Sequence, residues 1–397
     1  MKIDKQNCIL VGSDIIPQDD EGGSGTVAWE VCKILTKKGN KVVVLTRGKL
    51  KSTEKETIDN IEIYRYKNNI IKCKKIFYQL QQSYKFNSIL LHHPFTSIGI
   101  LTSKIKDNTA IIYFFYSPWP EEYSIRSADL NIGHIKQKLG VLFRKYIEKK
   151  VLSKANKIIV LSQFMKQKLQ YLYNIQDNKI TIISGGINLE RFKPITVRKK
   201  LRKKLNLPEN RYILLTIRNL VSRMGIDNLI LAMNDLVRNY PDIYLVIGGR
   251  GYLEKKLKNL VSKLGLEKWI TFVGYIPDDI LPEYYQTADL FVLPTSKLEG
   301  FGLVTLESMS CGTPVLATPV GGTVEILKKF DKHFLFKGIN SEDMVEGIEK
   351  FLKQKDIHSN LRERCRRFVE DNYSWDKFSN TLEEIIYQTL KDTKSGR

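Results

Sequence analysis

The chain has 397 residues, 42% of them hydrophobic and 27% charged, with a formal net charge of +21. This length is too great for one ordinary core and predicts two α/β domains, while the composition excludes a disordered protein. Five scattered cysteines without a C-x-x-C pair argue against a disulfide framework or a structural zinc site, and they indicate a reducing compartment.

The sequence does not indicate a membrane-spanning or secreted protein. No stretch approaches 18 uninterrupted apolar residues, and the apolar run near the start is too short for a signal peptide. We therefore expect a cytoplasmic protein. The positive charge would suit nucleic acid, an anionic membrane surface or simply a proteome rich in lysine, but charge alone bears on partners and solubility, not on fold.

Short apolar runs rich in β-branched residues alternate with helical stretches along the chain. Several runs are apolar throughout, as expected for strands buried on both faces of a parallel sheet. Because the pattern restarts after Pro194, we predict an α/β fold of two doubly wound, Rossmann-like domains, over residues 1–194 and 195–373, facing a cleft. The expected strands are Ile9–Val11, Val42–Leu45, Ile61–Tyr66, Ile89–Leu91, Ile111–Phe115, Ile158–Leu161, Ile180–Ile183, Ile213–Ile217, Leu245–Ile247, Ile270–Val273, Leu290–Leu293 and Val315–Ala317.

A glycine-rich turn, Gly22-Gly23-Ser24-Gly25, follows the first expected strand. We expect a helix to begin just after it, near Thr26. The turn is not a G-x-G-x-x-G fingerprint, and alone it would be a weak signal. In a doubly wound fold it places Gly23 beyond the first strand, where the backbone can closely approach a ligand in the cleft.

Polar and aromatic residues follow two later strands of the first domain, in His92-His93-Pro94 and in residues 116–122. Because ligands bind beyond the carboxyl ends of the strands in open α/β sheets, we expect a ligand there. Trp119 offers a flat apolar face to a sugar, and Glu122 could act on a sugar hydroxyl. The competing interpretation is that these are core residues. The candidates on this side of the cleft are His92, Tyr116, Trp119 and Glu122.

Residues 135–152 combine basic and large apolar side chains at near-helical spacing. This predicts a basic amphipathic helix that could rest on anionic lipid and present the cleft to a membrane-bound substrate. The competing interpretation is a core-facing helix with a solvated basic face. The basic residues are Lys136, Lys138, Arg144, Lys145, Lys149 and Lys150, and the apolar ones are Leu139, Leu142, Phe143, Tyr146, Ile147 and Val151.

The second domain is expected to open with a short exposed helix over residues 197–205, where six residues are basic. They are Arg198, Lys199, Lys200, Arg202, Lys203 and Lys204.

The strongest motif is the segment from Glu299 to Glu307, which follows an expected strand and runs into a helix that Gly312 should end. The free amides at about residues 302–304 and the positive helix end would seat a diphosphate. We expect Glu307 to accept the hydroxyls of a ribose and Glu299 to lie beside the sugar ring. The alternative is an ordinary strand–loop–helix joint with solvated glutamates.

This segment resembles the E-x-F-G-x-x-x-x-E signature of the family 4 glycosyltransferases, which have the two-domain GT-B fold. The resemblance implies a retaining transfer from a nucleoside diphosphate sugar, with Glu299 catalytic. Donor contacts would come from Phe301, Gly302 and Leu303, and from backbone groups near Tyr275 and Ile276. Gly23 would approach the donor phosphate or the acceptor from across the cleft, and the strand-end candidates of the first domain would lie on the acceptor side. The last helix, residues 374–397, would cross back to the first domain. Other fragments follow in family order: Gly22–Gly25, Ile158–Met165, Ser184–Asn188, Arg191–Pro194, Phe272–Pro277, Gly312–Val315, Gly321-Gly322 with Glu325, and Tyr373–Trp375.

One segment departs from the family pattern. The family has an arginine and a lysine five apart in G-R-L-x-x-x-K-G, and aligning this chain on its leucine and glycine puts Asn219 and Met224 at those positions. Arg218 and Arg223 are each shifted by one residue. We expect them to supply both charges, because a guanidinium tolerates a small displacement and grips phosphate with two hydrogen bonds. The alternative is a pair of surface arginines.

The motifs also predict the co-substrates. No D-x-D motif lies on a suitable loop, since Asp19-Asp20 lacks the middle residue, so we expect a metal-free site in which arginines and helix amides neutralise the diphosphate. The expected donor is a UDP- or GDP-linked sugar, with no other cofactor. The expected acceptor is a glycan or lipid-linked glycan of cell-envelope synthesis.

Three other classes remain to be weighed. A non-hydrolysing nucleotide-sugar epimerase or a sugar-phosphate synthase would share the same diphosphate site. A nucleic-acid binder is not expected, because the lysines are spread through helices and no helix-turn-helix, KH or RNP signature appears. A catalytically dead scaffold is disfavoured because Glu299, Phe301, Gly302 and Glu307 are all present.

Overall fold

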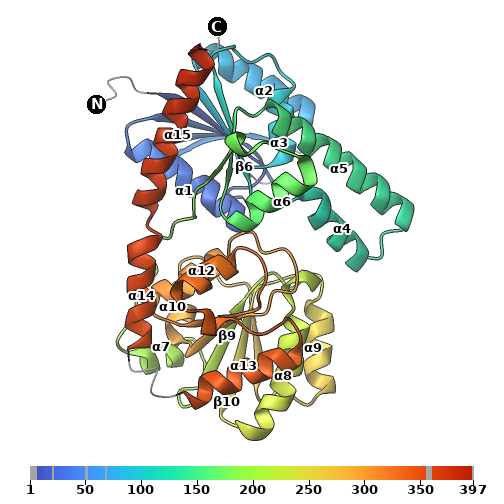
Figure 1. The fold of residues 1–397 in the computed structure, drawn as a ribbon, viewed down its shortest axis with the longest axis vertical. Helices are drawn as coiled ribbons and strands as arrows, with labels where there is room; N and C mark the ends of the chain where they lie inside the picture. The colour runs from blue at the N-terminus through green and yellow to red at the C-terminus, as the bar shows by residue number, and fades with distance from the viewer. Residues whose placement is uncertain (1–6, 20–21, 50–51, 68, 355–359, 396–397) are drawn as a thin grey trace. The chain divides into compact units, whose positions relative to one another are not determined.

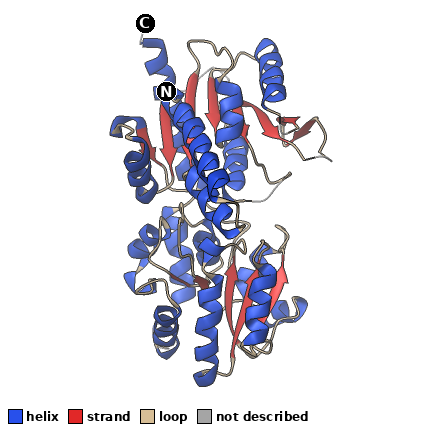
Figure 2. Cartoon of the chain, turned by 90° about the vertical axis from the view of Figure 1, so that its right-hand side faces the viewer, coloured by secondary structure: helices blue, strands red, loops and turns tan. Residues whose placement is uncertain are grey.

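The computed structural model describes residues 7–19, 22–49, 52–67, 69–354 and 360–395. The chain divides into two compact units, the first of residues 1–124, 132–185 and 375–397, and the second of residues 125–131 and 186–374. The sequence places its boundaries after residues 194 and 373, whereas the main chain changes unit after Gly185 and after Ser374. In each unit, strands form a sheet with helices packed on it (Figures 1 and 2).

The sheet of the first unit has eight strands among the described residues, in the order β3-β4-β2-β1-β5-β6-β7-β8. All neighbours are parallel except β3 and β4. The central strands β1 and β5 are almost wholly buried, which explains their unbroken apolar runs. The strands are β1 (Cys8–Ser13), β2 (Lys41–Arg47), β3 (Lys55–Ile58), β4 (Ile61–Tyr66), β5 (Ser88–Leu91), β6 (Ala110–Phe115), β7 (Lys157–Val160) and β8 (Ile180–Ile182).

Every strand expected from the sequence is confirmed, and β3 is an additional one. It pairs antiparallel with β4 at the edge of the sheet, and its four residues are exposed or only half-buried. Short edge strands with charged side chains avoid pairing with other chains. Because such a strand has neither an apolar run nor a buried face, the hydrophobic pattern does not reveal it.

Helices cover both faces of this sheet. The crossovers β1-α1-β2 and β5-α3-β6 run in opposite directions along the sheet, so right-handed connections put α1 and α3 on opposite faces. Helix α15 packs against α1, where Lys38 Nζ donates to Asn380 Oδ1 at 2.9 Å, and α3 packs against both α2 and α5. The helices are α1 (Gly23–Lys37), α2 (Ile70–Ser83), α3 (Pro94–Leu101), α4 (Trp119–Asp129), α5 (His134–Lys154), α6 (Gln163–Tyr173), η1 (Asp177–Lys179) and α15 (Trp375–Ser395). Residues 125–129 of α4 belong to the second unit.

The second unit has a parallel sheet in the order β11-β10-β9-β12-β13 among the described residues. Its strands are β9 (Tyr212–Ile217), β10 (Ile243–Gly248), β11 (Ile270–Gly274), β12 (Leu290–Leu293) and β13 (Val315–Ala317). Its helices are α7 (Arg198–Lys204), η2 (Ser222–Met224), α8 (Ile226–Asn239), α9 (Glu254–Lys263), α10 (Leu281–Thr287), α11 (Leu303–Ser310), α12 (Thr323–Phe330), η3 (Lys332–Phe334), α13 (Ser341–Lys353) and α14 (Leu361–Asn372).

Helix α7 is less exposed than its six basic residues suggest. Arg202 is only 6% exposed, and its Nη2 donates to Asp289 Oδ2 at 2.7 Å, while Arg198 Nη2 donates to Asp289 Oδ1 at 2.6 Å. Leu201 is also buried. The expectation of an exposed helix therefore holds for its four lysines but not for its two arginines, because Asp289 draws these onto the body of the unit.

Each sheet has one point at which the strand order reverses. In the first unit, β2 lies on one side of β1 and β5 lies on its other side. In the second unit, β10 and β12 flank β9 in the same way. The loops beyond the carboxyl ends of two such strands diverge, which leaves room for a ligand. A ligand site is therefore expected beyond β1 and β5, and beyond β9 and β12.

Candidate active site

The loop between β12 and α11 carries the glutamate motif. Gly302 precedes the helix with a φ of 93°, and a Cβ there would lie 2.1 Å from Thr323 Oγ1, so only glycine fits. Thr305 N closes the first turn on Gly302 O at 2.9 Å, and the amides of residues 302–304 precede the helical ladder. Gly312, with a φ of 78°, ends α11 as expected. The start of α11 can therefore present free amides to an anion.

Glu299 is held in this loop through both its side chain and its backbone. The residue is 8% exposed, and its Oε2 accepts from Arg218 Nη2 and, at 3.4 Å, from Thr295 Oγ1. Its carbonyl oxygen accepts from Gly322 N at 2.9 Å. Gly321 has a φ of 69°, and a Cβ there would stand 2.0 Å from that same carbonyl oxygen. The position of this carboxylate is thus determined by two neighbouring loops.

Arg218 directly follows β9, and its side chain extends over Met224 to Glu299. Its guanidinium lies against the Met224 sulfur, at 3.2 Å from Nε and 2.8 Å from Nη2. Met224 is 4% exposed, whereas Asn219 is exposed. The guanidinium of Arg218 thus covers the buried sulfur of Met224, which stands at one of the two positions of the family cations. Contact of Arg218 with a diphosphate stays a prediction.

Arg223 braces the loop that precedes Glu299. Its Nη1 donates to Leu298 O at 2.8 Å, and its own carbonyl oxygen accepts from Ser296 N at 2.9 Å and Lys297 N at 3.2 Å. Leu298 has a φ of 56°, a conformation that is costly for a leucine and needs such support. Contact of Arg223 with a diphosphate stays a prediction.

Glu307 lies one turn into α11 and is half-buried. Its Oε2 accepts from the hydroxyl of Tyr285 at 2.7 Å, and Tyr285 is fully buried in α10. Burial raises the pKa of the Glu307 carboxyl above its usual value, and the hydrogen bond from Tyr285 opposes that rise. Sequence reasoning missed Tyr285, because it belongs to a different helix and carries no motif.

The remaining donor-side candidates lie near the ends of neighbouring strands. Ile276, two residues beyond β11, is 6% exposed, and the half-buried ring of Tyr275 has the Arg250 guanidinium 5.4 Å from its centroid. Phe301 is 6% exposed and meets Tyr373 edge-on at 6.2 Å, while Leu303 is half-buried. Arg250 was missed from the sequence, where it appears as one more surface cation.

In the first unit, the glycine turn is part of a helix. Helix α1 begins at Gly23, not near Thr26, because the chain turns at Gly22, whose φ is 156°. Thr26 N donates to Gly22 O at 3.0 Å, which closes the first turn. Gly23 is exposed in that turn, beyond the end of β1. It therefore lies at the reversal point of the sheet, as its predicted role requires.

His93 joins this turn to the end of β5. Its Nδ1 accepts from Asp14 N at 3.2 Å and lies 2.9 Å from Ser13 Oγ, and its Nε2 lies 2.9 Å from Ser24 Oγ. The bond from Asp14 N favours the tautomer that carries its proton on Nε2 and donates to Ser24. Burial lowers the pKa of His93, and the charges of Asp14 and Glu122 oppose that change.

His92 points into the core instead. It is 1% exposed, stacks on Phe114 at 4.2 Å between centroids, and has its Nδ1 2.6 Å from the Tyr116 hydroxyl. Burial lowers the pKa of His92 well below its usual value, so the imidazole is neutral. Of the two adjacent histidines, His93 is therefore the one beside the glycine turn.

The other acceptor-side candidates follow β6. Tyr116, Trp119 and Glu122 are all half-buried, and Glu122 Oε1 accepts from Ser117 Oγ at 2.7 Å. The Arg144 guanidinium lies 5.0 Å from the ring centroid of Trp119, so one face of that ring is already covered. These residues and His93 come from adjacent strands at the carboxyl edge of the sheet.

Other features of the described residues limit where a ligand can bind. Residues 7–19, 22–49, 52–67, 69–354 and 360–395 contain no group of three His, Cys, Asp or Glu side chains that could hold a metal ion. Asp19 pairs with Arg65 Nε at 2.7 Å, and Asp20 lies outside the described residues.

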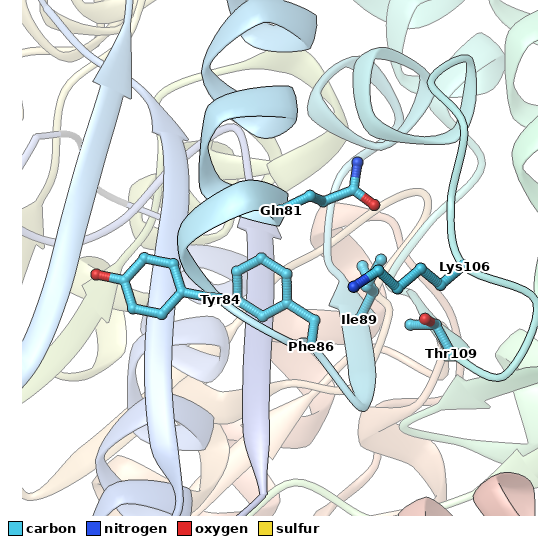
Figure 3. Close-up of a pocket in the computed structure, with 6 residues that line it drawn as sticks. All are labelled: Gln81, Tyr84, Phe86, Ile89, Lys106 and Thr109. Atoms are coloured by element: carbon cyan, nitrogen blue, oxygen red, sulfur yellow. The ribbon is translucent and has the colours of Figure 1, made fainter.

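The small cavity in Figure 3 holds about 10 Å³, the space of one water molecule, and lies at the amino ends of β5 and β6. In the described part of the chain, no helix is both long and apolar enough to cross a bilayer.

Similarity to known proteins is spread over both units. The family described as "Glycosyltransferase Family 4" matches residues 21–191, and the family "Glycosyl transferases group 1" matches residues 197–387. N-acetyl-alpha-D-glucosaminyl L-malate synthase of Bacillus anthracis is 30% identical over 198 residues, 50% of this chain and 51% of that protein. The chain spans between about half and two thirds of the length of the curated relatives that it matches.

Solved structures share the fold over nearly the whole chain, and two of them serve as examples. Sucrose-phosphate synthase of Thermosynechococcus elongatus is 22% identical, has a TM-score of 0.84, and is matched over 98% of this chain and 100% of that one. HepE of Anabaena, in complex with UDP-glucose, is 17% identical with a TM-score of 0.75, over 97% and 99%. The fold is thus GT-B, and the chain belongs to the family 4 glycosyltransferases.

Proposed function

We propose that this chain transfers a sugar from a UDP- or GDP-linked donor to a hydroxyl group, with retention at the anomeric carbon and without a metal ion. The observation that carries the proposal is the Arg218–Glu299 pair, placed where β9 and β12 diverge and next to the free amides of α11. A cation, a carboxylate and a helix start at one reversal point suit a diphosphate leaving group attached to a sugar.

The charges in this site support a division of labour. When the bond to the diphosphate breaks, negative charge grows on the phosphate oxygens, and Arg218 with the α11 amides would stabilise it. Positive charge grows on the sugar ring, and the Glu299 carboxylate would stabilise that charge and orient the ring. Because Arg218 already engages Oε2, we assign Glu299 an electrostatic role and not that of a covalent nucleophile.

The nucleotide half of the donor is assigned to Glu307. Its carboxylate lies on the same helix as the free amides, and Tyr285 fixes its orientation while one oxygen stays available for ribose hydroxyls. HepE, which has the same fold, is described in complex with UDP-glucose. A thermal-shift panel of UDP, GDP, ADP and their sugars identifies the base, because a ligand that binds only the folded state raises the unfolding temperature.

The acceptor is assigned to the first unit, at the end of β5 and β6. His93, Tyr116, Trp119 and Glu122 provide hydrogen-bonding groups and an aromatic face there. We infer a glycan or a lipid-linked glycan acceptor, made at the cytoplasmic face of the membrane during cell-envelope synthesis.

A second candidate is a sugar-phosphate synthase or a non-hydrolysing epimerase, which would use the same diphosphate site. The observation that favours this candidate is the shared fold with a sucrose-phosphate synthase. A sugar-phosphate acceptor should then support turnover when glycans do not, and an epimerase should convert the donor without any acceptor.

The test measures release of nucleoside diphosphate with and without candidate acceptors. Retention predicts a product with the anomeric configuration of the donor, as read from the proton coupling at the anomeric carbon. Activity should survive excess EDTA. Complete loss on chelation, restored by magnesium or manganese, would refute the metal-free site, and an inverted product would refute retention.

A further inference from the structure

Helix α5 exposes a stripe of large apolar side chains. They recur three or four residues apart, so at 3.6 residues per turn they share about 100° of the helix circumference. Buried apolar faces point at a core, but these side chains are between 58% and 75% exposed. The members of this apolar stripe are Ile135, Leu139, Leu142, Phe143 and Tyr146.

The opposite side of α5 faces the unit. Ile147, Val151 and Leu152 are buried there, next to Glu148, the one carboxylate in α5. Glu148 is 0% exposed, and it accepts from Trp119 N at 3.2 Å and from the Tyr173 hydroxyl. Burial raises the pKa of Glu148 to about 8. The outward surface of α5 therefore carries no negative charge.

Lysines border the apolar stripe on both sides. Lys136 lies on one side, and Lys138, Lys145 and Lys149 lie on the other, all of them exposed. In the described chain none of them forms an ion pair. An apolar stripe with cationic borders is the pattern of a helix that lies in the surface of an anionic bilayer.

The helix is braced so that the stripe stays open. The Arg144 guanidinium lies 3.5 Å from the ring centroid of Tyr123 in α4, and Gln137 Nε2 donates to Ser124 O at 2.9 Å. A Cβ at Gly140 would come within 2.3 Å of the Tyr123 ring, so the two helices touch closely. Figure 1 shows α5 running past α3 and beyond the strands of its sheet.

We propose that the apolar stripe and its bordering lysines bind the surface of an anionic lipid bilayer. The charge decides the occupant, because the net charge of +21 and the unpaired lysines attract anionic lipid. A second copy of the chain packed on the same stripe would bring these lysines against each other. The inference rests on the proposed function in one respect only: membrane binding would bring the enzyme to a lipid-linked acceptor.

The experiment measures co-sedimentation of the full chain with vesicles of phosphatidylcholine alone or mixed with phosphatidylglycerol. Binding should require phosphatidylglycerol and fall steeply between low and high salt. Reversing three of the bordering charges with Lys138→Glu, Lys145→Glu and Lys149→Glu should weaken it more than about a hundredfold, since each lysine contributes about a factor of five. Leu142→Ser with Phe143→Ser should weaken it more than about tenfold.

Matched controls lie elsewhere on the chain. Lys255→Glu, Lys256→Glu and Lys263→Glu in α9 make the same change of charge at exposed positions, and Tyr171→Ser removes a side chain that is 88% exposed in α6. Neither control should reduce binding more than about threefold. Equal loss in the controls, equal binding to neutral vesicles, or no binding at low salt would each overturn the proposal.

Two further readouts separate this inference from the others. Donor hydrolysis in solution should be unchanged in the α5 variants. Loss of vesicle binding with intact hydrolysis therefore supports lipid binding by the apolar stripe. Absence of hydrolysis in every variant counts against the proposed function alone. If gel filtration gives a dimer that Leu142→Ser with Phe143→Ser dissociates, a second copy covers the stripe and the lipid proposal is wrong.

Discussion

The reversal points of the two sheets are held in different ways. Beyond β9 and β12, backbone lies on backbone with no room for a side chain at Gly321, and the charges of Arg218 and Glu299 are paired. Beyond β1 and β5, side chains make the contacts, as where His93 bridges Ser13 and Ser24. Rigid backbone suits a donor diphosphate that is the same in every reaction, whereas side-chain contacts can vary with the acceptor.

The largest effect should come from the charged pair of the second unit. Glu299→Ala should lower turnover by about a hundredfold or more, because the positive charge on the sugar loses its counter-charge, with nucleotide affinity changed little. Steady-state kinetics and calorimetry with the nucleotide measure the two quantities. If Glu299→Ala and Glu307→Ala lower affinity and turnover alike, the assignment of separate roles is wrong.

The next effect concerns Glu307. Glu307→Ala should weaken nucleotide binding by about 1.5–3 kcal/mol, through loss of hydrogen bonds to a charged acceptor. Tyr285→Phe should weaken it less, since it removes only the group that orients the carboxylate. Tyr284→Phe, next to it in α10, is the matched control and should bind nucleotide as the parent does. Equal affinities for Tyr284→Phe and Tyr285→Phe would contradict the orienting role.

A third prediction isolates the backbone contact. Gly321→Ala should cost about 1–3 kcal/mol of unfolding free energy beyond the control, because its Cβ would collide with Glu299 O. The control is Gly265→Ala, which has the same φ of 69° in open space and should cost about 1 kcal/mol for the backbone conformation alone. Urea denaturation measures both. Similar losses would mean that the loop yields and that Glu299 is not fixed by this contact.

The difference between the two regions also explains what the sequence could predict. Every expected strand is present, because buried parallel strands form apolar runs. The contiguous segment from Glu299 to Glu307 could be read directly, whereas Tyr285 and Arg250 reach the site from other elements and left no signal. His92 and His93 look equivalent in sequence, and only the packing of His92 on Phe114 distinguishes them. The exposure of the stripe on α5 likewise depends on what the fold leaves uncovered.

The smallest predicted effect tests the distinction between the buried His92 and its neighbour His93. Burial keeps His92 neutral in the folded chain, whereas in the unfolded chain it takes up a proton near its ordinary pKa of about 6.5. As the pH falls below that value, the unfolded state binds one more proton than the folded state at this residue, so folding loses up to about 1.4 kcal/mol per pH unit. His92→Phe removes this dependence. Its stability relative to the parent, measured by urea denaturation, should therefore be constant above about pH 7.5 and improve steadily below about 6.5. Any fixed cost of repacking against Phe114 is the same at every pH and cancels in that comparison. A difference that does not change with pH would mean that His92 takes up a proton in the folded chain and that burial does not keep it neutral.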